Sequence, residues 1–289
     1  MNKEMLVSVI IPTLGRETLY PLVEKLLEQK TKFNYEIVIV PQVKLKENLL
    51  RNKRIKIFYE PLGKGFAYYR NIGIKKSGGE IISFIDDDEM PIGNKWLNNL
   101  VKPILENNEK VVTSGYKIKL GEEYLTDSIS LLGFPGGGAI GFRNMWGVNS
   151  EDYTEHICTG NMSIKKEVIS KLGGFDISLK FGNEDVDLGD RLIFNNIKIK
   201  YIEEATVYHA PRRGFINFAK WNFLRGRSAA EYLSKRRGKN KIYHRFNSSL
   251  IIINKNYKSI LILGILFMMF FQYVFQLLGY INQRITNNE

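Results

Sequence analysis

EIISFIDDD, residues 80–88, is the stretch that decides the fold of this 289-residue chain. Its apolar part is rich in β-branched and aromatic residues, and Gly78 and Gly79 before it and Pro91 after it are typical of the turns that bound a short strand. Three carboxylates therefore stand at the carboxyl end of a strand, which is where ligands bind in open α/β sheets. Oxygen ligands of this kind suit Mg²⁺ or Mn²⁺ and, with the metal, a diphosphate. An acidic, solvated loop that merely ends the strand is the alternative interpretation.

The segments around this stretch alternate between apolar, strand-like runs and helix-like runs. We expect strands over 7–11, 35–40, 55–59, 80–86 and 111–120, and helices over 17–29, 65–76 and 94–107. Strands this apolar are covered on both faces, which indicates a mainly parallel sheet between helices and hence a doubly wound α/β fold. Residues 131–142, LLGFPGGGAIGF, are expected to form a loop that either admits a ligand or lies on the surface.

The composition is that of a globular protein with excess positive charge. Lysine and arginine number 42 against 30 aspartates and glutamates, a formal net charge of +12, which indicates an anionic partner such as nucleic acid, a lipid headgroup or a phosphorylated substrate. The single cysteine, Cys158, excludes an intramolecular disulfide and fits a reducing compartment, and we interpret it as a small buried residue. Only about seven apolar residues precede Pro12, too few for the core of a signal peptide, so we do not expect secretion.

The C-terminal part of the chain has a different character. Residues 259–279, SILILGILFMMFFQYVFQLLG, contain no charged residue, and a helix of that length rises about 31 Å, close to the thickness of the hydrocarbon core of a bilayer. We predict a single membrane-spanning helix there. Gln272 and Gln276 lie one helical turn apart, which leaves an interfacial or oligomer-forming helix as the alternative.

Residues 211–258, before that helix, form a basic amphipathic segment. Only one acidic residue, Glu231, accompanies the cations of residues 211–245, which are Arg212, Arg213, Lys220, Arg225, Arg227, Lys235, Arg236, Arg237, Lys239, Lys241 and Arg245. Apolar residues are interleaved with them at Phe215, Phe218, Trp221, Phe223 and Leu224. Such a segment either lies on an anionic membrane surface or binds single-stranded nucleic acid. Its place beside the apolar helix favours the membrane, so we predict no nucleic-acid partner, and the positive-inside rule places the large N-terminal part in the cytoplasm.

Several segments of the first 210 residues together resemble family 2 glycosyltransferases of the GT-A fold. They are VSVIIPTLGR at 7–16, GKGFAYYRNIGIKKSGGEIISFIDDDEMP at 63–91, GNMSIKKEVISKLGGFDISLKFGNEDVDLGDRL at 160–192 and VYH at 207–209. The resemblance implies a GT-A nucleotide-diphospho-sugar transferase fold, a Rossmann-like mixed sheet between helices, and transfer of a sugar from a nucleotide-sugar donor with inversion at the anomeric carbon. The expected organisation is a catalytic domain at 1–210, the basic juxtamembrane segment at 211–258, a transmembrane helix at 259–279 and a short tail at 280–289.

The resemblance also implies a donor and metal site. The residues implied to lie near the donor are Pro12, Thr13, Arg70, Asn71, Asp86 and Asp87. Within the acidic triplet, Asp86 is expected to contact the nucleoside and Asp88 the metal, whereas Asp87 has no more specific role. His209 is implied to complete the site for Mn²⁺ or Mg²⁺, whose charge assists departure of the diphosphate. The alternatives are that Arg70 is a solvated surface residue and that His209 has a purely structural role.

The implied general base is Asp185, at the start of a helix expected after a turn at Gly182 and Asn183. Inversion requires one carboxylate to take the proton of the acceptor hydroxyl on the face opposite the leaving diphosphate. Glu184 is expected to bind the acceptor or orient the site. The alternative for both carboxylates is capping of the helix, because acidic side chains are favoured in a first helical turn. Asp187 and Arg191 are spaced for a plain i, i+4 ion pair.

The acceptor side is less defined by the sequence. Gly160 and Asn161 resemble the family's segment beneath the acceptor, although an asparagine there can simply cap a turn. Many relatives have an acidic pair after the second strand that reaches the nucleotide base, but here the chain runs into Pro41-Gln42-Val43, which leaves the nucleotide open, with Glu60 as a partial substitute.

The expected function is therefore that of an inverting, metal-dependent glycosyltransferase in cell-surface polysaccharide biosynthesis. A UDP-sugar is the favoured donor, and the acceptor is a glycan or a lipid-linked intermediate, since anchoring raises the effective concentration of an enzyme near a membrane-bound substrate. A polyprenyl-phosphate sugar synthase and a non-catalytic membrane scaffold are the alternatives. One apolar helix is too little for a polymerising synthase that extrudes its product.

Overall fold

The computed structural model describes residues 5–46, 50–133, 136–235 and 242–286. Contacts divide the chain into two compact units. Unit 1 comprises residues 1–115, 147–178 and 184–209, and unit 2 comprises residues 116–146, 179–183 and 210–289. Residues 116–146, which the sequence pattern placed within the catalytic domain, therefore group with the C-terminal helices. Arg236, Arg237, Lys239 and Lys241 of the predicted basic segment lie outside the described residues.

A mixed sheet forms the centre of unit 1. In the described part of the chain its strand order is β3-β2-β1-β4-β9-β6-β10-β8. Strands β3, β2, β1 and β4 are parallel, β9 is antiparallel to both β4 and β6, and β10 is parallel to β6 but antiparallel to β8. The strands are β1 (Leu6–Thr13), β2 (Asn34–Pro41), β3 (Ile55–Ile57), β4 (Ile81–Ile85), β6 (Val111–Thr113), β8 (Tyr153–Thr154), β9 (Asn161–Lys165) and β10 (Ile199–Tyr201).

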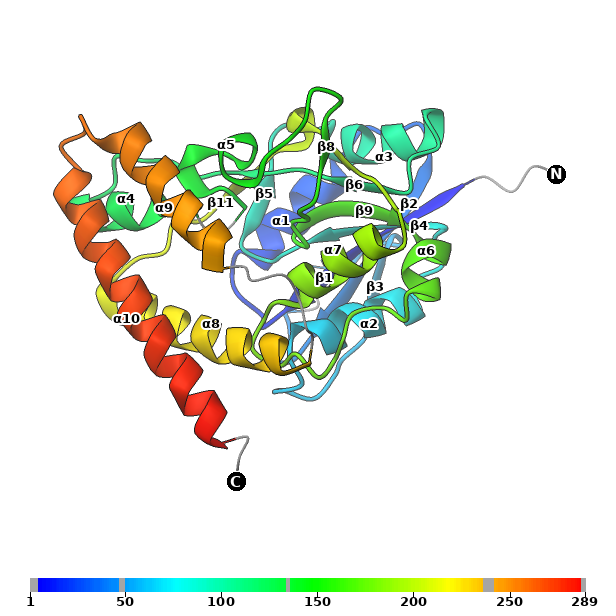
Figure 1. The fold of residues 1–289 in the computed structure, drawn as a ribbon. Coiled ribbons are helices and arrows are strands. Elements are labelled where there is room, and N and C mark those ends of the chain that lie inside the picture. The colour runs from blue at the N-terminus through cyan, green and yellow to red at the C-terminus, as the bar shows by residue number, and fades with distance from the viewer. Residues whose placement is uncertain (1–4, 47–49, 134–135, 236–241, 287–289) are drawn as a thin grey trace. The chain divides into compact units, whose positions relative to one another are not determined.

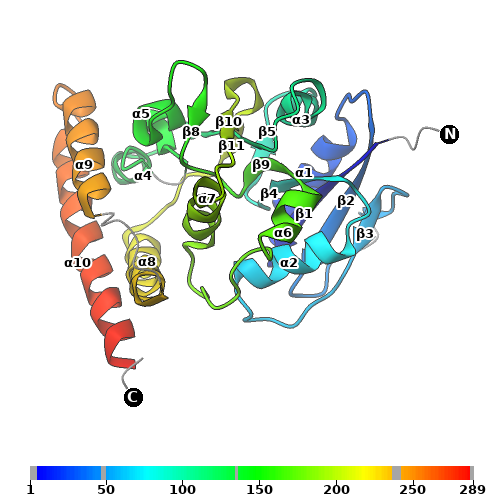
Figure 2. The same ribbon diagram turned by 45° about the vertical axis from the view of Figure 1, so that its right-hand side comes forward.

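Helices cover both faces of this sheet, as the apolar strands predict (Figures 1 and 2). One face packs against α2, α6 and α7 through a core that includes Ile10, Phe84 and Leu188. Helices α1 and α3 lie on the opposite face. The bounds are α1 (Leu19–Leu27), α2 (Phe66–Lys76), α3 (Trp96–Glu106), α6 (Lys166–Lys171), α7 (Glu184–Phe194) and the short helix η3 (Glu203–Ala205).

The single strand predicted over 111–120 is wrong, because β6 ends at Thr113 and a separate short strand, β7 (Tyr116–Lys117), follows. The backbone between them bonds to Asn161: the N–H of Ser114 donates to the carbonyl of Asn161 at 2.9 Å, and the Asn161 side chain donates to the carbonyl of Gly115 at 2.9 Å. The first bond continues the pairing of β6 with β9 by one residue, and at Gly115 the Asn161 side chain takes the place of a backbone partner.

Two further strands of unit 1 belong to a second, smaller sheet that begins just after β4. Strand β5 (Glu89–Pro91) follows the acidic triplet, and β11 (Val207–His209) pairs with it antiparallel, so that His209 stands opposite Glu89. A residue from near the end of unit 1 is thereby brought beside the carboxylates at 86–88.

Unit 2 is helical around its own apolar core, which includes Ile129, Phe218, Ile265 and Met268. The segment 131–142, expected as a loop, holds the short helix η2 and the start of α5, and residues 134–135 of it lie outside the described residues. The helices are α4 (Tyr124–Ser130), η2 (Gly138–Ile140), α5 (Phe142–Trp146), α8 (Phe215–Lys235), α9 (Ile242–Asn256) and α10 (Ile262–Thr286). Among the described residues, α10 alone is long and apolar enough to cross a membrane, and 39% of its most apolar window is buried.

Candidate active site

The acidic triplet lies at the carboxyl end of β4, in contact with the end of β1. The Thr13 hydroxyl donates to Asp87 at 2.6 Å, and Arg16 reaches Asp87 at 3.0 Å and Asp88 at 2.5 Å. Burial raises the pKa of Asp87, while the Thr13 hydrogen bond and the Arg16 charge act against that rise. Parallel neighbours end at the same sheet edge, which is why residues so far apart in the chain meet here.

Arg70, on α2, joins the triplet to the start of α7. One guanidinium nitrogen donates to Asp86 at 2.8 Å and another to Glu184 at 2.6 Å. Arg70 is only 2% exposed, so the alternative of a solvated surface residue is wrong. Burial by itself lowers the pKa of Arg70, but the two carboxylates outweigh it and the net shift is upward. Within the described part of the chain, the buried Arg70 Nε has no hydrogen-bond partner.

The first turn of α7 carries both carboxylates predicted for catalysis. Glu184 is buried, and burial raises its pKa although Arg70 acts in the opposite direction. Asp185 is half-buried, and its carboxylate accepts the backbone N–H of Val186 at 2.7 Å. Asp187 is buried and pairs with Arg191 at 2.7 Å, which confirms the predicted i, i+4 ion pair. Of these three acidic residues, Asp185 is therefore the partly exposed one that forms no ion pair with an arginine among the described residues.

Asp88 and His209, the two residues predicted to hold a divalent cation, lie beside each other. The His209 Nε2 lies 3.7 Å from an Asp88 oxygen, and both side chains keep some exposure, 11% and 25%. In the described residues no group of three or more His, Cys, Asp or Glu side chains is arranged to hold a metal. Two protein ligands are nevertheless sufficient for Mg²⁺-like ions, which usually keep several waters and bind one or two carboxylates together with substrate phosphates.

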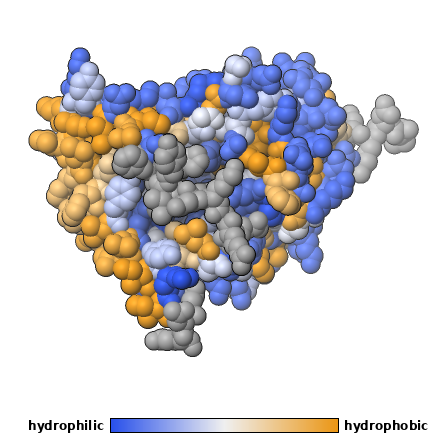
Figure 3. Space-filling view, viewed as in Figure 1, coloured by the Kyte–Doolittle hydropathy of each residue, from blue (hydrophilic) through white to orange (hydrophobic). Residues whose placement is uncertain are grey.

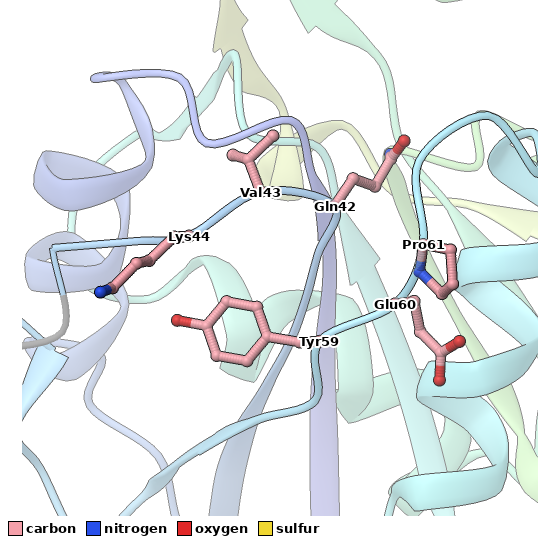
Figure 4. Close-up of a pocket in the computed structure, with 6 residues that line it drawn as sticks. All are labelled: Gln42, Val43, Lys44, Tyr59, Glu60 and Pro61. Atoms are coloured by element: carbon pink, nitrogen blue, oxygen red, sulfur yellow. The ribbon is translucent and has the colours of Figure 1, made fainter.

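A shallow hollow of about 530 Å³ lies just beyond the carboxyl ends of β2 and β3 (Figure 4). It is lined by Gln42, Val43, Lys44, Tyr59, Glu60 and Pro61. Glu60 accepts a hydrogen bond from the Tyr68 hydroxyl at 2.8 Å, and Tyr59 is 44% exposed. It lies where the chain runs on from β2 into Gln42 and Val43, and Glu60 is the acidic residue of its lining.

Two asparagines predicted to contact ligands form hydrogen bonds within unit 1. Asn161 is fully buried: it accepts from the Trp96 indole at 2.9 Å and donates to two backbone carbonyls. Asn71 exchanges two hydrogen bonds with the backbone of Phe175, at 2.8 and 2.9 Å. The buried Asn161 therefore has no surface to offer an acceptor, whereas the donor contact predicted for the half-buried Asn71 stays a prediction.

Arg16 is the site residue that sequence reasoning missed. Arg16 lies three residues after β1. Its partners, Asp87 and Asp88, are more than seventy positions further along the chain, and no local sequence pattern reveals contacts at that separation. The only available signal was a cation close to the end of a strand that neighbours the acidic one.

The fold and these residues define a glycosyltransferase of the α/β, GT-A class with a long apolar C-terminal helix. A family model described as glycosyl transferase family 2 matches residues 8–173, more than half of the chain, and the chain belongs to that family. A second model, described as the N-terminal domain of galactosyltransferase, matches residues 144–212.

Curated relatives include a synthase and a glucosyltransferase. A chondroitin synthase of Pasteurella multocida is 25% identical over 248 residues, which are 74% of this chain but 26% of that one. A UDP-Glc:alpha-D-GlcNAc-diphosphoundecaprenol beta-1,3-glucosyltransferase of Escherichia coli is 30% identical over 121 residues, 40% of this chain and 47% of that one. The chain thus spans about a quarter of the first relative and about half of the second.

Solved structures share the fold at low sequence identity. A mannosyltransferase of Pyrobaculum calidifontis, in complex with GDP-Man and Mn²⁺, has a TM-score of 0.58 and 16% identity over 92% of this chain and 74% of that one. GalNAc-T7 with UDP, GalNAc and Mn²⁺ has a TM-score of 0.58 and 16% identity over 90% of this chain and 58% of that one. These likenesses bear on the fold alone.

Proposed function

We propose that the chain is an inverting, metal-dependent glycosyltransferase that moves a sugar from a nucleotide diphosphate donor to a lipid-linked or polysaccharide acceptor. The observation that carries this proposal is the Arg70 bridge, because one buried guanidinium contacts both Asp86 at the donor end and Glu184 beside the proposed base. Donor and base carboxylates on separate elements thereby belong to one charged network. A UDP-sugar remains the favoured donor.

In this mechanism Asp185 acts as the general base. Its carboxylate takes the proton of the acceptor hydroxyl as the acceptor oxygen forms a bond to the anomeric carbon. The bond between that carbon and the diphosphate breaks on the opposite face, and the nucleoside diphosphate leaves with the electron pair. Glu184, tied to Arg70, positions the start of α7 rather than taking a proton.

Asp88 and His209 are the residues that would hold Mn²⁺ or Mg²⁺. When bound, the cation supplies neutralisation of the charge that develops on the leaving diphosphate. Arg16 contacts the same aspartate, so it either yields that position or shares it with the donor phosphates. The hollow beyond β2 and β3 suits the nucleotide base, for which Tyr59 offers a partly exposed ring and Gln42 an amide.

The proposed acceptor lies at the membrane. The Escherichia coli relative is named for an acceptor on diphosphoundecaprenol, and α10 gives this chain a means of membrane attachment. We place the catalytic unit on the cytoplasmic side, because cations precede α10 in large excess. The length and composition of α10 predict that it crosses the bilayer. Helix α8 packs against α10, and this contact bears on whether α10 crosses the bilayer or lies in one leaflet.

Calorimetric titration of UDP, GDP and their sugar conjugates, with Mn²⁺ or with chelator, tests the assignment. We expect Asp88→Asn to lose metal-dependent binding, and Asp185→Asn to keep binding but lose release of nucleoside diphosphate in the presence of membrane extract. Asp190→Asn, on the same helix, is the matched control and should retain both. Equal binding by Asp88→Asn and the unchanged protein would refute the metal assignment, and no binding by a folded protein would favour the scaffold alternative.

The polyprenyl-phosphate sugar synthase differs in its product. A sugar attached directly to a lipid monophosphate, identified by mass spectrometry after incubation with polyprenyl phosphate, would replace the proposed acceptor class. Addition of a sugar to a lipid diphosphate sugar would instead support the proposed acceptor class.

A further inference from the structure

The hairpin of α9 and α10 in unit 2 presents a broad apolar surface (Figure 3). Its most exposed side chains are Ile260 at 88% and Leu263 at 74%. Further large apolar side chains on it that are at least 39% exposed are Leu250, Tyr257, Leu266, Phe267, Phe270, Tyr273, Leu277, Leu278, Ile281 and Ile285. A surface of this extent exceeds the isolated apolar patches of ordinary soluble monomers and indicates a partner.

The other face of α10 is buried within unit 2, apolar in its first half, with Ile265 and Met268, and polar in its second half. Gln272, Gln276 and Gln283 are each at most 7% exposed. The Gln276 amide donates to the Asn222 side chain of α8 at 2.8 Å, and Arg227 of α8 donates to Gln283 at 2.7 Å. Of the two glutamines that left an interfacial helix as the alternative to a span, Gln276 therefore bonds to α8.

Glycines bring the backbones of α8 and α10 into direct contact. A Cβ placed on Gly226 would lie 2.0 Å from the carbonyl oxygen of Gln276, and one placed on Gly279 would lie 1.9 Å from that of Phe223. Only glycine permits this approach, so the pair is fixed at one crossing point and cannot separate without losing the buried amide contacts.

A spanning α10 conflicts with this pairing. Helix α8 carries Lys220, Arg225, Arg227 and Lys235, and charged side chains are strongly disfavoured in the hydrocarbon core. If α10 crossed the bilayer with α8 attached, these cations would enter the membrane; if α8 detached, the buried glutamines would face lipid without partners. Neither penalty arises when α10 lies along one leaflet.

We infer that α10 lies in the plane of an anionic leaflet, with the apolar surface of the α9–α10 hairpin among the acyl chains. This inference rests on the proposed membrane location and specifies its form. Lys255, Lys258 and Arg284 flank the apolar surface and can extend to headgroup phosphates, as basic residues do at membrane interfaces. A second copy of the chain would instead bring these like charges toward one another, which favours anionic lipid as the occupant.

Cysteine labelling distinguishes the in-plane helix from a span. In a Cys158→Ser background of the full chain, Lys258→Cys and Thr286→Cys mark the two ends of the helix. Inside-out membrane vesicles from the expression host expose the cytoplasmic face to a membrane-impermeant maleimide. We expect both positions to react before detergent is added. Reaction at residue 258 with protection of residue 286 until detergent is added would overturn the inference in favour of a span.

Flotation on sealed vesicles tests membrane binding separately. Leu263→Gln, Phe270→Gln and Leu277→Gln are each expected to weaken binding to vesicles containing phosphatidylglycerol by about tenfold or more, because each removes a large apolar side chain from the inserted surface. Leu120→Gln, at another exposed leucine of unit 2, should bind as the unchanged protein does.

The flotation experiment also separates failure of the membrane location from failure of the inserted apolar surface. Absence of flotation by the unchanged protein refutes the membrane location itself. Flotation that is indifferent to all three substitutions refutes the inserted surface, and a stable dimer that the same substitutions dissociate assigns that surface to a second copy. Thermal unfolding of each variant checks that the fold is retained.

Discussion

Replacement of Arg70 by methionine isolates the charge network at the centre of the site. The variant keeps an unbranched side chain of comparable length but loses hydrogen bonds of 2.8 Å to Asp86 and 2.6 Å to Glu184. The Glu184 side chain is 9% exposed and loses its buried counter-ion, whereas that of Asp86 is 30% exposed and regains water. Removing one partner of a buried pair costs about 3–5 kcal/mol, and the partial exposure of Asp86 places the expected loss near the lower end, about 3 kcal/mol.

The loss should depend on pH with a definite sign. Burial already raises the pKa of Glu184, and Arg70 opposes that rise, so the variant raises the pKa further. A carboxyl whose folded pKa exceeds its unfolded value binds its proton more tightly in the folded state, so stability increases as pH falls through the folded pKa. The deficit of Arg70→Met relative to the unchanged protein is therefore expected to be smaller at pH 5 than at pH 8.

Urea unfolding followed by circular dichroism at both pH values measures this effect. Arg70→Met combined with Glu184→Gln should recover part of the loss, because the unpaired buried charge is removed. Lys25→Met is the control, since the exposed Lys25–Glu28 pair contributes about 0–1 kcal/mol. A deficit of Arg70→Met no larger than that of the control, or one that grows as pH falls, would refute the network as described.

Three further changes test other parts of the structure. Burial acts to raise the pKa of Glu36, but its hydrogen bonds and its pairing with Lys56 lower the pKa below the usual range. The stabilisation by Glu36 should therefore be lost as pH falls through the folded pKa. In urea unfolding, Glu36→Gln should be less stable than the unchanged protein by about 1–3 kcal/mol at pH 7, and the difference should shrink as the pH is lowered. Arg16→Gln frees Asp88 and should strengthen binding of Mn²⁺ alone roughly tenfold in a calorimetric titration, and unaltered affinity would argue against competition. Gly279→Val should lower stability by about 1–3 kcal/mol in thermal unfolding, because its side chain meets the α8 backbone.

The local sequence pattern predicts the bounds of the fully buried strands of unit 1 well. Strands β1, β2 and β4 lie within one or two residues of their predicted bounds, because strands covered on both faces are almost continuously apolar. The same pattern places Thr13 and Asp86 at carboxyl ends of neighbouring strands, and the sheet brings them to one edge. This part of the site follows from local periodicity together with the rule for ligands in α/β sheets.

The partners of individual polar side chains do not follow from local pattern. Asn161 reads as a turn-capping or acceptor-facing residue, yet its position is set by Trp96, 65 positions away. Likewise the grouping of residues 116–146 with the C-terminal helices depends on which apolar faces pair. Amphipathic periodicity indicates that a helix has a buried face but does not identify the element that covers it.

Two arginines neutralise the acidic edge of the sheet in different ways, and their burial separates their roles. Arg70 is 2% exposed and bound at two carboxylates, so its position is fixed by the fold. The side chain of Arg16 is 45% exposed and contacts Asp87 and Asp88 from the solvent side, so it can exchange a carboxylate for another anion at little structural cost. Loss of Arg70 is therefore expected to appear first in stability, whereas loss of Arg16 should appear in ligand affinity with the fold intact. On this view the donor end of the site is fixed on the α2 side and adaptable on the β1 side, where a diphosphate and its cation would enter.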